Sequence, residues 1–346
     1  VQIESLVDAA WTDVTPEHRL PLAMKKGEWH NLRGGRNGSV DITVSDFKGQ
    51  NLGPDNRTGL AAFEGVDQVT MVILADAVGK NEKGDVLFAA ANVQALHEAM
   101  LEHAESMADR FAIVDCRAGL DLQAVQEQRG ELSSKYGAFY YPWIYVDNPL
   151  SPTGAQKLVP PSGHIAGLYA RVDQTRGVHK APANELLFGA RGLEVQVSMA
   201  EQNLLNPMAI NCIRKFPGRG TRVWGARTLA DDASWRYINV RRLFLQIEES
   251  IDEGTQWTVF EPNDQTLWAK IRRDVGAFLY RFYLSGAFFG TTPQEAYFVK
   301  CDAETNPPEV IDAGQVVIEV GIAPVKPAEF VIFRVGQKPT GSSVSE

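Results

Sequence analysis

The sequence predicts a mixed α/β (α+β) protein with more than one domain. From residue 69 to residue 146, short apolar strands alternate with amphipathic helices, which is typical of a largely parallel sheet covered by helices. Two long helices, each with an apolar stripe, follow after residue 233. The chain has 346 residues, of which 44% are apolar and 22% charged, so it is large enough to bury more than one core.

The first 65 residues predict a small, irregular β region. They are rich in Gly, Asn, Asp and Lys, and they contain one apolar, β-branched run at 40–44 that predicts a strand. A cluster of Gly, Asn, Pro and Asp at 49–59 predicts turns.

Residues 66–200 predict a central α/β domain. Its expected elements are strands at 69–75, 111–114 and 139–146, helices at 89–109 and 120–135, a Pro-rich loop at 148–161, and a short helix that begins at Ser162. In the helix at 89–109, an apolar face at helical spacing predicts burial of Val93, Leu96, Met100, Ala104 and Met107.

A second unit is expected at 201–323, followed by an arm and polar tail at 324–346. Strands at 209–216 and 222–229 flank a Pro-Gly-Arg-Gly turn, and helices follow at 233–253 and 264–284. The stretch 315–335 predicts two strands separated by Pro324 and Pro327, because proline cannot donate to a strand ladder.

Composition argues against several classes of function. The 43 acidic residues exceed the 34 Lys and Arg, for a net charge of -9, which disfavours general binding to nucleic acid or anionic membranes. Cys116, Cys212 and Cys301 lie far apart and predict reduced thiols. The chain shows neither a secretory signal in its first 13 residues nor an apolar run of membrane-spanning length, so we expect folding in the cytoplasm and no direct membrane insertion.

Three aspartates at predicted strand ends provide the strongest enzyme signal. Asp76, Asp115 and Asp147 occupy positions where open α/β sheets place catalytic groups, although turns and helix caps also favour Asp there. His164 lies two residues after Ser162, a spacing at which helical side chains do not face each other. The strand-end aspartates leave open an alternative function, a soluble α/β hydrolase that uses Asp115, Asp147 and His164.

The remaining motifs predict no catalytic residue, cofactor or metal site. The other histidines lack metal-ligand spacing, and no Gly-x-Ser-x-Gly elbow is present. The glycine-rich run at 34–38 precedes a predicted strand instead of following one, so it does not match a nucleotide-binding loop.

Charges on the two long helices suggest docking. The helix at 233–253 has its arginines first and its acids last, which opposes the helix dipole and suggests partners outside the helix, such as a repeating lattice. On the helix at 264–284, a basic stripe separate from the apolar face contains Lys270, Arg273 and Arg281.

Eight segments together resemble one known family. They are YPW at 141–143, PPSGHIAG at 160–167, RVD at 171–173, VHKAPAN at 178–184, NCI at 211–213, GTRVWGARTL at 220–229, YINVRR at 237–242 and FEPN at 260–263. In this order they resemble the tail sheath proteins of contractile phages, R-type pyocins and extracellular contractile injection systems, over residues 58–335. The family's usual N-terminal arm opening is not recognisable in the first ten residues.

The resemblance implies a central domain with subtilisin-like topology but no protease triad. It also implies a C-terminal domain that faces an inner tail tube, and terminal arms that add strands to neighbouring subunits. The expected partners are further copies in a helical homopolymer, the inner tube protein, and the baseplate and terminator or cap proteins. Such a sheath assembles in the cytoplasm of the producing bacterium and then contracts as part of a virion tail or injection particle.

Two sets of residues are expected to serve this assembly. The basic stripe is expected to face the inner tube. The C-terminal strand at 329–335 is largely apolar on both faces, so we expect it to complete a sheet in a neighbouring subunit through Phe330, Val331, Ile332, Phe333 and Val335. The sequence leaves open whether the particle is a virion or a bacterial injection system.

Overall fold

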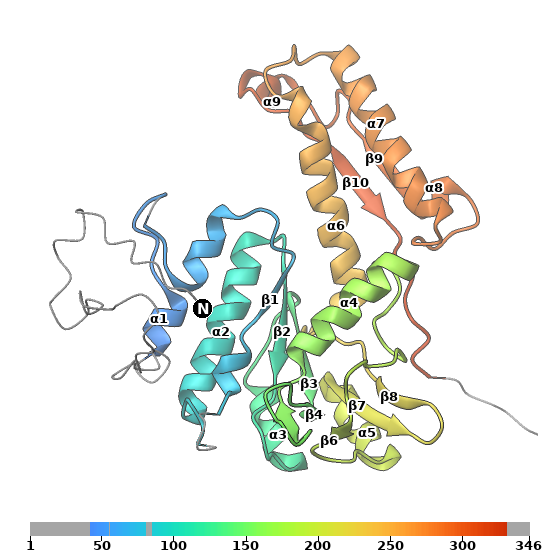
Figure 1. The fold of residues 1–346 in the computed structure, drawn as a ribbon. Coiled ribbons are helices and arrows are strands. Elements are labelled where there is room, and N and C mark those ends of the chain that lie inside the picture. The colour runs from blue at the N-terminus through green and yellow to red at the C-terminus, as the bar shows by residue number, and fades with distance from the viewer. Residues whose placement is uncertain (1–41, 55, 81–84, 331–346) are drawn as a thin grey trace, which may run out of the picture. The chain divides into compact units, whose positions relative to one another are not determined.

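The computed structural model describes residues 42–54, 56–80 and 85–330 (Figure 1). These residues contain a five-stranded sheet and, after it in the chain, a pair of long helices with a small sheet of their own. The helices of at least four residues are α1 (Val44–Lys48), η3 (Gly59–Gly65), η4 (Ala75–Val78), α2 (Ala90–Met107), α3 (Leu122–Gly130), α4 (Ser162–Arg176), α5 (Met199–Leu205), α6 (Ile238–Thr255), α7 (Gln265–Leu284), α8 (Pro293–Ala296) and α9 (Pro308–Asp312). The strands are β1 (Met71–Ile73), β2 (Phe111–Asp115), β3 (Gly137–Tyr141), β4 (Ile144–Asp147), β5 (Gln156–Val159), β6 (Gly192–Leu193), β7 (Ile210–Phe216), β8 (Gly220–Val223), β9 (Tyr297–Lys300) and β10 (Glu319–Ile322). The mixed α/β class is thereby confirmed, while the likeness to subtilisin stays a prediction.

The five-stranded sheet has the order β1-β2-β3-β7-β8. The first four strands pair in parallel, and β8 returns antiparallel through the predicted turn. Every residue of β2 and β3 is buried, as expected for strands covered on both faces. In Figure 1, α2 lies on one side of β1 and β2 and α4 on the other, and both helices contact β2.

The predicted helix at 89–109 is confirmed as α2, and four of its five stripe residues are buried, with Met107 half-buried. The predicted helix at 120–135 is α3, which ends five residues earlier. It begins after Asp121, whose carboxylate accepts a hydrogen bond from Ala124 N at 2.9 Å and so caps the first turn.

The single strand predicted at 139–146 is wrong, because the chain divides there into β3 and β4. Pro142 stands between the two strands and has no amide hydrogen for a ladder. After it, β4 leaves the main sheet and pairs antiparallel with β5 and β6. The strand β5 lies inside the expected loop at 148–161, and its first two residues, Gln156 and Lys157, are polar and exposed.

The strand predicted at 40–44 is also wrong where the structure describes it, since Val44 begins α1. Thr43 and Asp46 form a reciprocal capping box: Asp46 N donates to Thr43 Oγ1 at 3.4 Å, and Thr43 N donates to Asp46 Oδ2 at 2.7 Å. Residues 1–41, which contain the rest of that prediction and the glycine-rich run at 34–38, lie outside the described residues.

Strands after residue 200 complete the central sheet. β7 pairs with β3, and Asn211 Nδ2 donates to Phe139 O at 3.1 Å across the same junction. Hydrogen bonding therefore joins 210–223 to the sheet that β1 begins, although these residues follow the expected boundary at residue 200. The division into 1–65, 66–200, 201–323 and 324–346 stays a prediction.

A second core is built from α6, α7 and the antiparallel pair β9–β10. The helix predicted at 233–253 is α6, which begins five residues later, at Ile238. The helix predicted at 264–284 is α7, which begins after Asp264, whose carboxylate caps two amides at 2.9 Å each. Leu267, Ile271 and Val275 face this core. α6 is shared, because Ile238 and Leu245 pack in the first core whereas Leu243 and Ile247 pack in the second. Among the described helices, none is long and apolar enough to span a membrane.

Candidate functional site

Asp115 lies at the end of β2, fully inside the protein, with 2% of its surface exposed. Its Oδ1 accepts a hydrogen bond from Ser162 N at 2.8 Å, which ties β2 to the first turn of α4. Burial raises the pKa of Asp115 to about 7, against hydrogen bonding with Ser162, which lowers it. The contact satisfies a free amide at a helix start, which is a structural use of the side chain.

The residues of the hydrolase alternative do not form one hydrogen-bonded group. Asp147 ends β4 in the three-stranded sheet, where it is exposed and pairs with Arg191 at 2.5 Å. Among the described residues, no hydrogen bond joins His164 to Asp115 or Asp147, and the imidazole ring lies against Gly189. Burial lowers the pKa of His164. Asp76 lies in η4, directly after β1.

In the part of the chain that the structure describes, no group of three or more His, Cys, Asp or Glu side chains is arranged to hold a metal ion.

The arginines of α6 find partners within the subunit, so they do not need a lattice to supply them. Arg242 donates to both carboxylate oxygens of Asp173 in α4, at 2.9 and 2.5 Å, and stacks on Tyr169. Arg241 pairs with Glu248 of the same helix, and its guanidinium lies over the rings of Tyr136 and Trp235. Both arginines are more than nine-tenths buried.

The basic stripe lies on the exposed face of α7. Lys270, Arg273 and Arg281 are all exposed, and so are Ala277 and Tyr280 beside them. Arg273 donates to Asp274 at 2.8 Å in a pair whose two side chains are 72% and 44% exposed. The pair is open to solvent, so screening weakens it and leaves the arginine available to a partner surface.

The sheet formed by β9 and β10 has two strands within the described residues. The strands pair over four residues, from Glu319 with Lys300 to Ile322 with Tyr297. Among the described residues no third strand joins this pair, and the outer edge of a sheet is the feature that strand addition uses.

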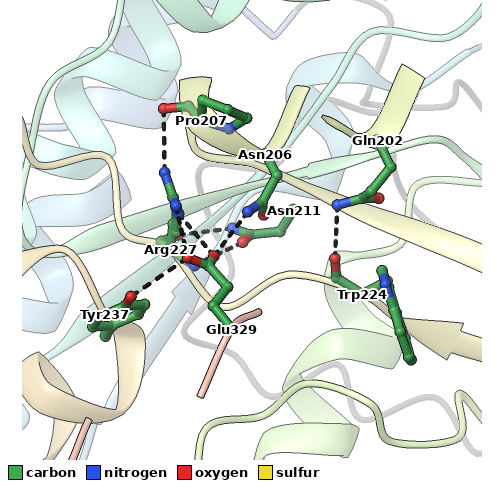
Figure 2. A network of polar contacts seen from close by, with 8 residues as sticks. All are labelled: Gln202, Asn206, Pro207, Asn211, Trp224, Arg227, Tyr237 and Glu329. Carbon is green, nitrogen blue, oxygen red and sulfur yellow. Dashed lines mark hydrogen bonds and ion pairs between the residues drawn. The ribbon is translucent and has the colours of Figure 1, made fainter. Parts of the chain in front are cut away.

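Glu329, at the start of the expected C-terminal arm, is held by a carboxylate socket, which we define as Asn206, Arg227 and Tyr237 (Figure 2). Arg227 donates to Glu329 from Nε at 2.8 Å and from Nη2 at 2.6 Å. Asn206 Nδ2 donates to the same carboxylate at 2.8 Å, and Tyr237 OH lies 3.4 Å from it. The side chains of Arg227 and Glu329 are 12% and 17% exposed.

Asn211 holds the backbone of the socket residue Arg227 in place. Its Oδ1 accepts a hydrogen bond from Arg227 N at 2.8 Å, and its Nδ2 donates to Arg227 O at 2.8 Å, so the arginine backbone is fixed to β7 (Figure 2). Burial alone would raise the pKa of Glu329, but hydrogen bonds from Arg227 and Asn206 hold it below its usual range.

Sequence reasoning missed this socket. The available signal was a single acid, Glu329, at the start of a largely apolar strand. Of the expected arm residues, Phe330 is described and is 65% exposed. Val331, Ile332, Phe333 and Val335 lie outside the described residues, so their role stays a prediction.

Comparisons with known proteins agree with the two cores. The family model described as the phage tail sheath protein central domain matches residues 51–229, and that of the phage tail sheath C-terminal domain matches residues 230–338. The tail sheath protein of Burkholderia phage BcepMu is 30% identical over 243 residues, which are 64% of this chain and 48% of that protein. The tail sheath protein of Vibrio phage KVP40 is 29% identical over 192 residues, covering 54% and 28%.

Solved structures extend the similarity. The contracted helical sheath of the anti-feeding prophage (AFP) is 36% identical, with a TM-score of 0.66 over 81% of this chain and 74% of that one. The contracted PVC sheath, from an extracellular contractile injection system, is 34% identical with the same TM-score, over 81% and 75%. The chain spans about half or less of the curated relatives described above. Because the two family models match most of its length, the chain belongs to the phage tail sheath family.

Proposed function

We propose that the protein is a structural subunit of a contractile sheath, which polymerises around an inner tube and contracts to drive the tube through a target envelope. The observation that carries this proposal is the similarity to the contracted AFP sheath, which covers 81% of the chain at 36% identity. That similarity includes far more than one domain of the chain, so it argues for the same kind of subunit and not only for a shared central fold.

The inner tube is the proposed partner of the basic stripe. Lys270, Arg273 and Arg281 stand exposed on one helix of an acidic protein, so they favour an acidic surface. Exposed charge pairs stabilise weakly and are screened by salt, which suits an extended state that is later released. The baseplate and a terminator or cap protein are the remaining proposed partners.

Neighbouring subunits are the proposed partners of the C-terminal arm. Strand addition needs a donor segment and a sheet with an open edge. The strand expected at 329–335 supplies the first, and the pair β9–β10 in another copy supplies a suitable second. Assembly is proposed to occur in the cytoplasm of the producing bacterium, before the particle acts outside it.

Catalysis is not part of this proposal. The alternative hydrolase would need Asp115, Asp147 and His164 within hydrogen-bonding reach of a common substrate. Asp115 is instead bonded to a helix amide, and Asp147 is paired with Arg191 in another sheet. Saturable hydrolysis that is lost in His164→Ala would contradict the structural assignment.

Electron microscopy of the purified full-length chain tests the proposal. We expect long tubes of uniform diameter in negative stain, because a heterologous interface that does not close on itself produces a helical polymer. A small closed oligomer, at concentrations where related sheaths polymerise, would contradict it.

A further inference from the structure

The segment 324–330, with which the expected arm begins, is fixed to the rest of the subunit at two points. At the first, Val325 N donates to Ala287 O and Val325 O accepts from Asn239 Nδ2, both at 3.1 Å. At the second, Glu329 enters the carboxylate socket. Between these points Lys326 and Ala328 are exposed.

We propose that the carboxylate socket is the anchor that fixes where the arm leaves its own subunit, so that tension along the arm reaches the central sheet directly. The inference rests on the proposed function, because it assumes that the arm beyond residue 329 pairs with a neighbour. The socket then holds Glu329 within its own subunit, and the strand expected beyond it connects that subunit to a neighbour.

The construction of the socket supports this role. Its three residues come from separate parts of the chain: Asn206 follows α5, Arg227 follows β8, and Tyr237 precedes α6. Burying a carboxylate carries a desolvation cost that an apolar arm could avoid, so the acid is favoured only where donors match it. Here Arg227 donates two charge-assisted hydrogen bonds to the carboxylate of Glu329, and the Asn206 amide donates a third. Together they fix the position and orientation of Glu329.

The spacing of the two fixed points shows what the anchor changes. If Glu329 were released, the last fixed residue would be Val325, and the four residues that follow it, at no more than about 3.4 Å each, would give the arm at most about 14 Å of slack. That length equals about four residues of strand register. A tether with this slack would let neighbouring bodies move apart before it transmitted force.

The anchor can be measured by electron paramagnetic resonance in the full-length chain. Spin labels are attached at Ala328→Cys and at Asn203→Cys, both exposed positions, while the three native cysteines are buried. We expect a narrow distance distribution with Glu329 present and one about twofold broader in Glu329→Ala, because the arm root gains conformational freedom. Glu329→Gln, which keeps the shape but loses the charge, should give an intermediate width.

Glu304→Ala provides the matched control, because it removes an ion-paired glutamate whose side chain is 79% exposed. Its distribution should equal that of the parent. An unchanged distribution in both Glu329→Ala and Glu329→Gln would overturn the anchor. The measurement uses subunits kept below the concentration at which tubes form, so it is independent of polymerisation, and failure of the parent chain to form tubes at higher concentration would count against the proposed function alone.

A second readout tests the mechanical consequence. Particles carrying Glu329→Gln should show a several-fold larger fraction of partly contracted sheaths after triggering than particles carrying Glu304→Ala, because slack uncouples neighbouring subunits. Equal fractions would show that force does not pass through this anchor.

Discussion

Arg242 donates two hydrogen bonds to the carboxylate of Asp173, at 2.9 and 2.5 Å, and so joins the N-terminal half of α6 to α4. The arginine is 8% exposed and the aspartate 22%. Since α6 also contributes side chains to both cores, this pair lies where the central sheet and the C-terminal helices share one element.

Removing the aspartate should therefore be costly. We expect Asp173→Ala to lower the free energy of unfolding of the unassembled subunit by about 3 kcal/mol, because it leaves a buried guanidinium without its counter-charge. In the double variant with Arg242→Met the two effects should be less than additive. Urea unfolding of the four proteins measures the coupling, with Glu304→Ala, from an exposed pair, as a control that should change nothing measurable. Strict additivity would show that the pair is not a unit.

Local patterns allowed much of the fold to be predicted. The apolar stripes of α2, α6 and α7 repeat at helical spacing within about 20 residues, so one window of sequence contains the whole signal. The apolar run of β2 was equally local. Where two local signals competed the prediction failed: the β-branched residues near Val44 favoured a strand, and the capping box of Thr43 and Asp46 prevailed.

The candidate site was harder to predict from the sequence, because its contacts join residues that are far apart along the chain. Arg242 and Asp173 are 69 residues apart, and Arg227 and Glu329 are 102 apart. No spacing rule connects such positions. Charge order on α6 did indicate that its arginines needed partners, but only the folded chain identifies Asp173 as one of them.

The pH dependence of stability should report on Asp115. Its pKa is raised by burial to about 7 from an ordinary value of 3.8, so between these values the folded state holds a proton that the unfolded state releases. The free energy of unfolding should fall as pH rises through this window, by at most about 1.4 kcal/mol per pH unit, and level off above it.

Asp115→Asn removes this titration while keeping an acceptor for Ser162 N. Relative to the parent, the variant should gain stability from pH 4.5 to pH 8 in urea unfolding. Buried His97, whose pKa is lowered to about 4, titrates alike in both proteins and cancels in the difference. Parallel pH profiles would mean that Asp115 does not carry the proton.

Reversing charge on the basic stripe should weaken the extended sheath. With Lys270→Glu and Arg273→Glu combined, we expect fewer extended sheaths on purified tubes and a smaller effect of added salt, because the attraction that salt screens is gone. Lys157→Glu, an exposed lysine of β5, makes the same kind of change elsewhere and should be neutral. Unchanged assembly in the double variant would make the stripe an ordinary solvated face.

Asn211 should be critical to the arm base although it does not touch the arm. Its fully buried amide makes three hydrogen bonds, two of them to the backbone of Arg227. Asn211→Ala would leave those groups unsatisfied, so we expect a loss of about 2 to 4 kcal/mol in unfolding free energy. Exposed Asn203→Ala on α5 is the control. A loss no larger than that of the control would show that water replaces the amide.

Two truncations separate the strand from its anchor. A chain that ends at Phe330 keeps Glu329 in the socket and loses every residue expected to pair with a neighbour except Phe330. We expect it to be a folded monomer, as stable as the parent subunit, that forms no tubes in electron microscopy.

A chain that ends at Val325 also empties the socket and leaves Arg227 without its carboxylate partner, so it should in addition lose about 1 to 3 kcal/mol in unfolding free energy. The difference in stability between the two chains then measures the socket, and the shared loss of polymerisation measures the strand. If the chain that ends at Phe330 fails to fold, the strand at 329–335 packs within its own subunit and does not serve as an arm.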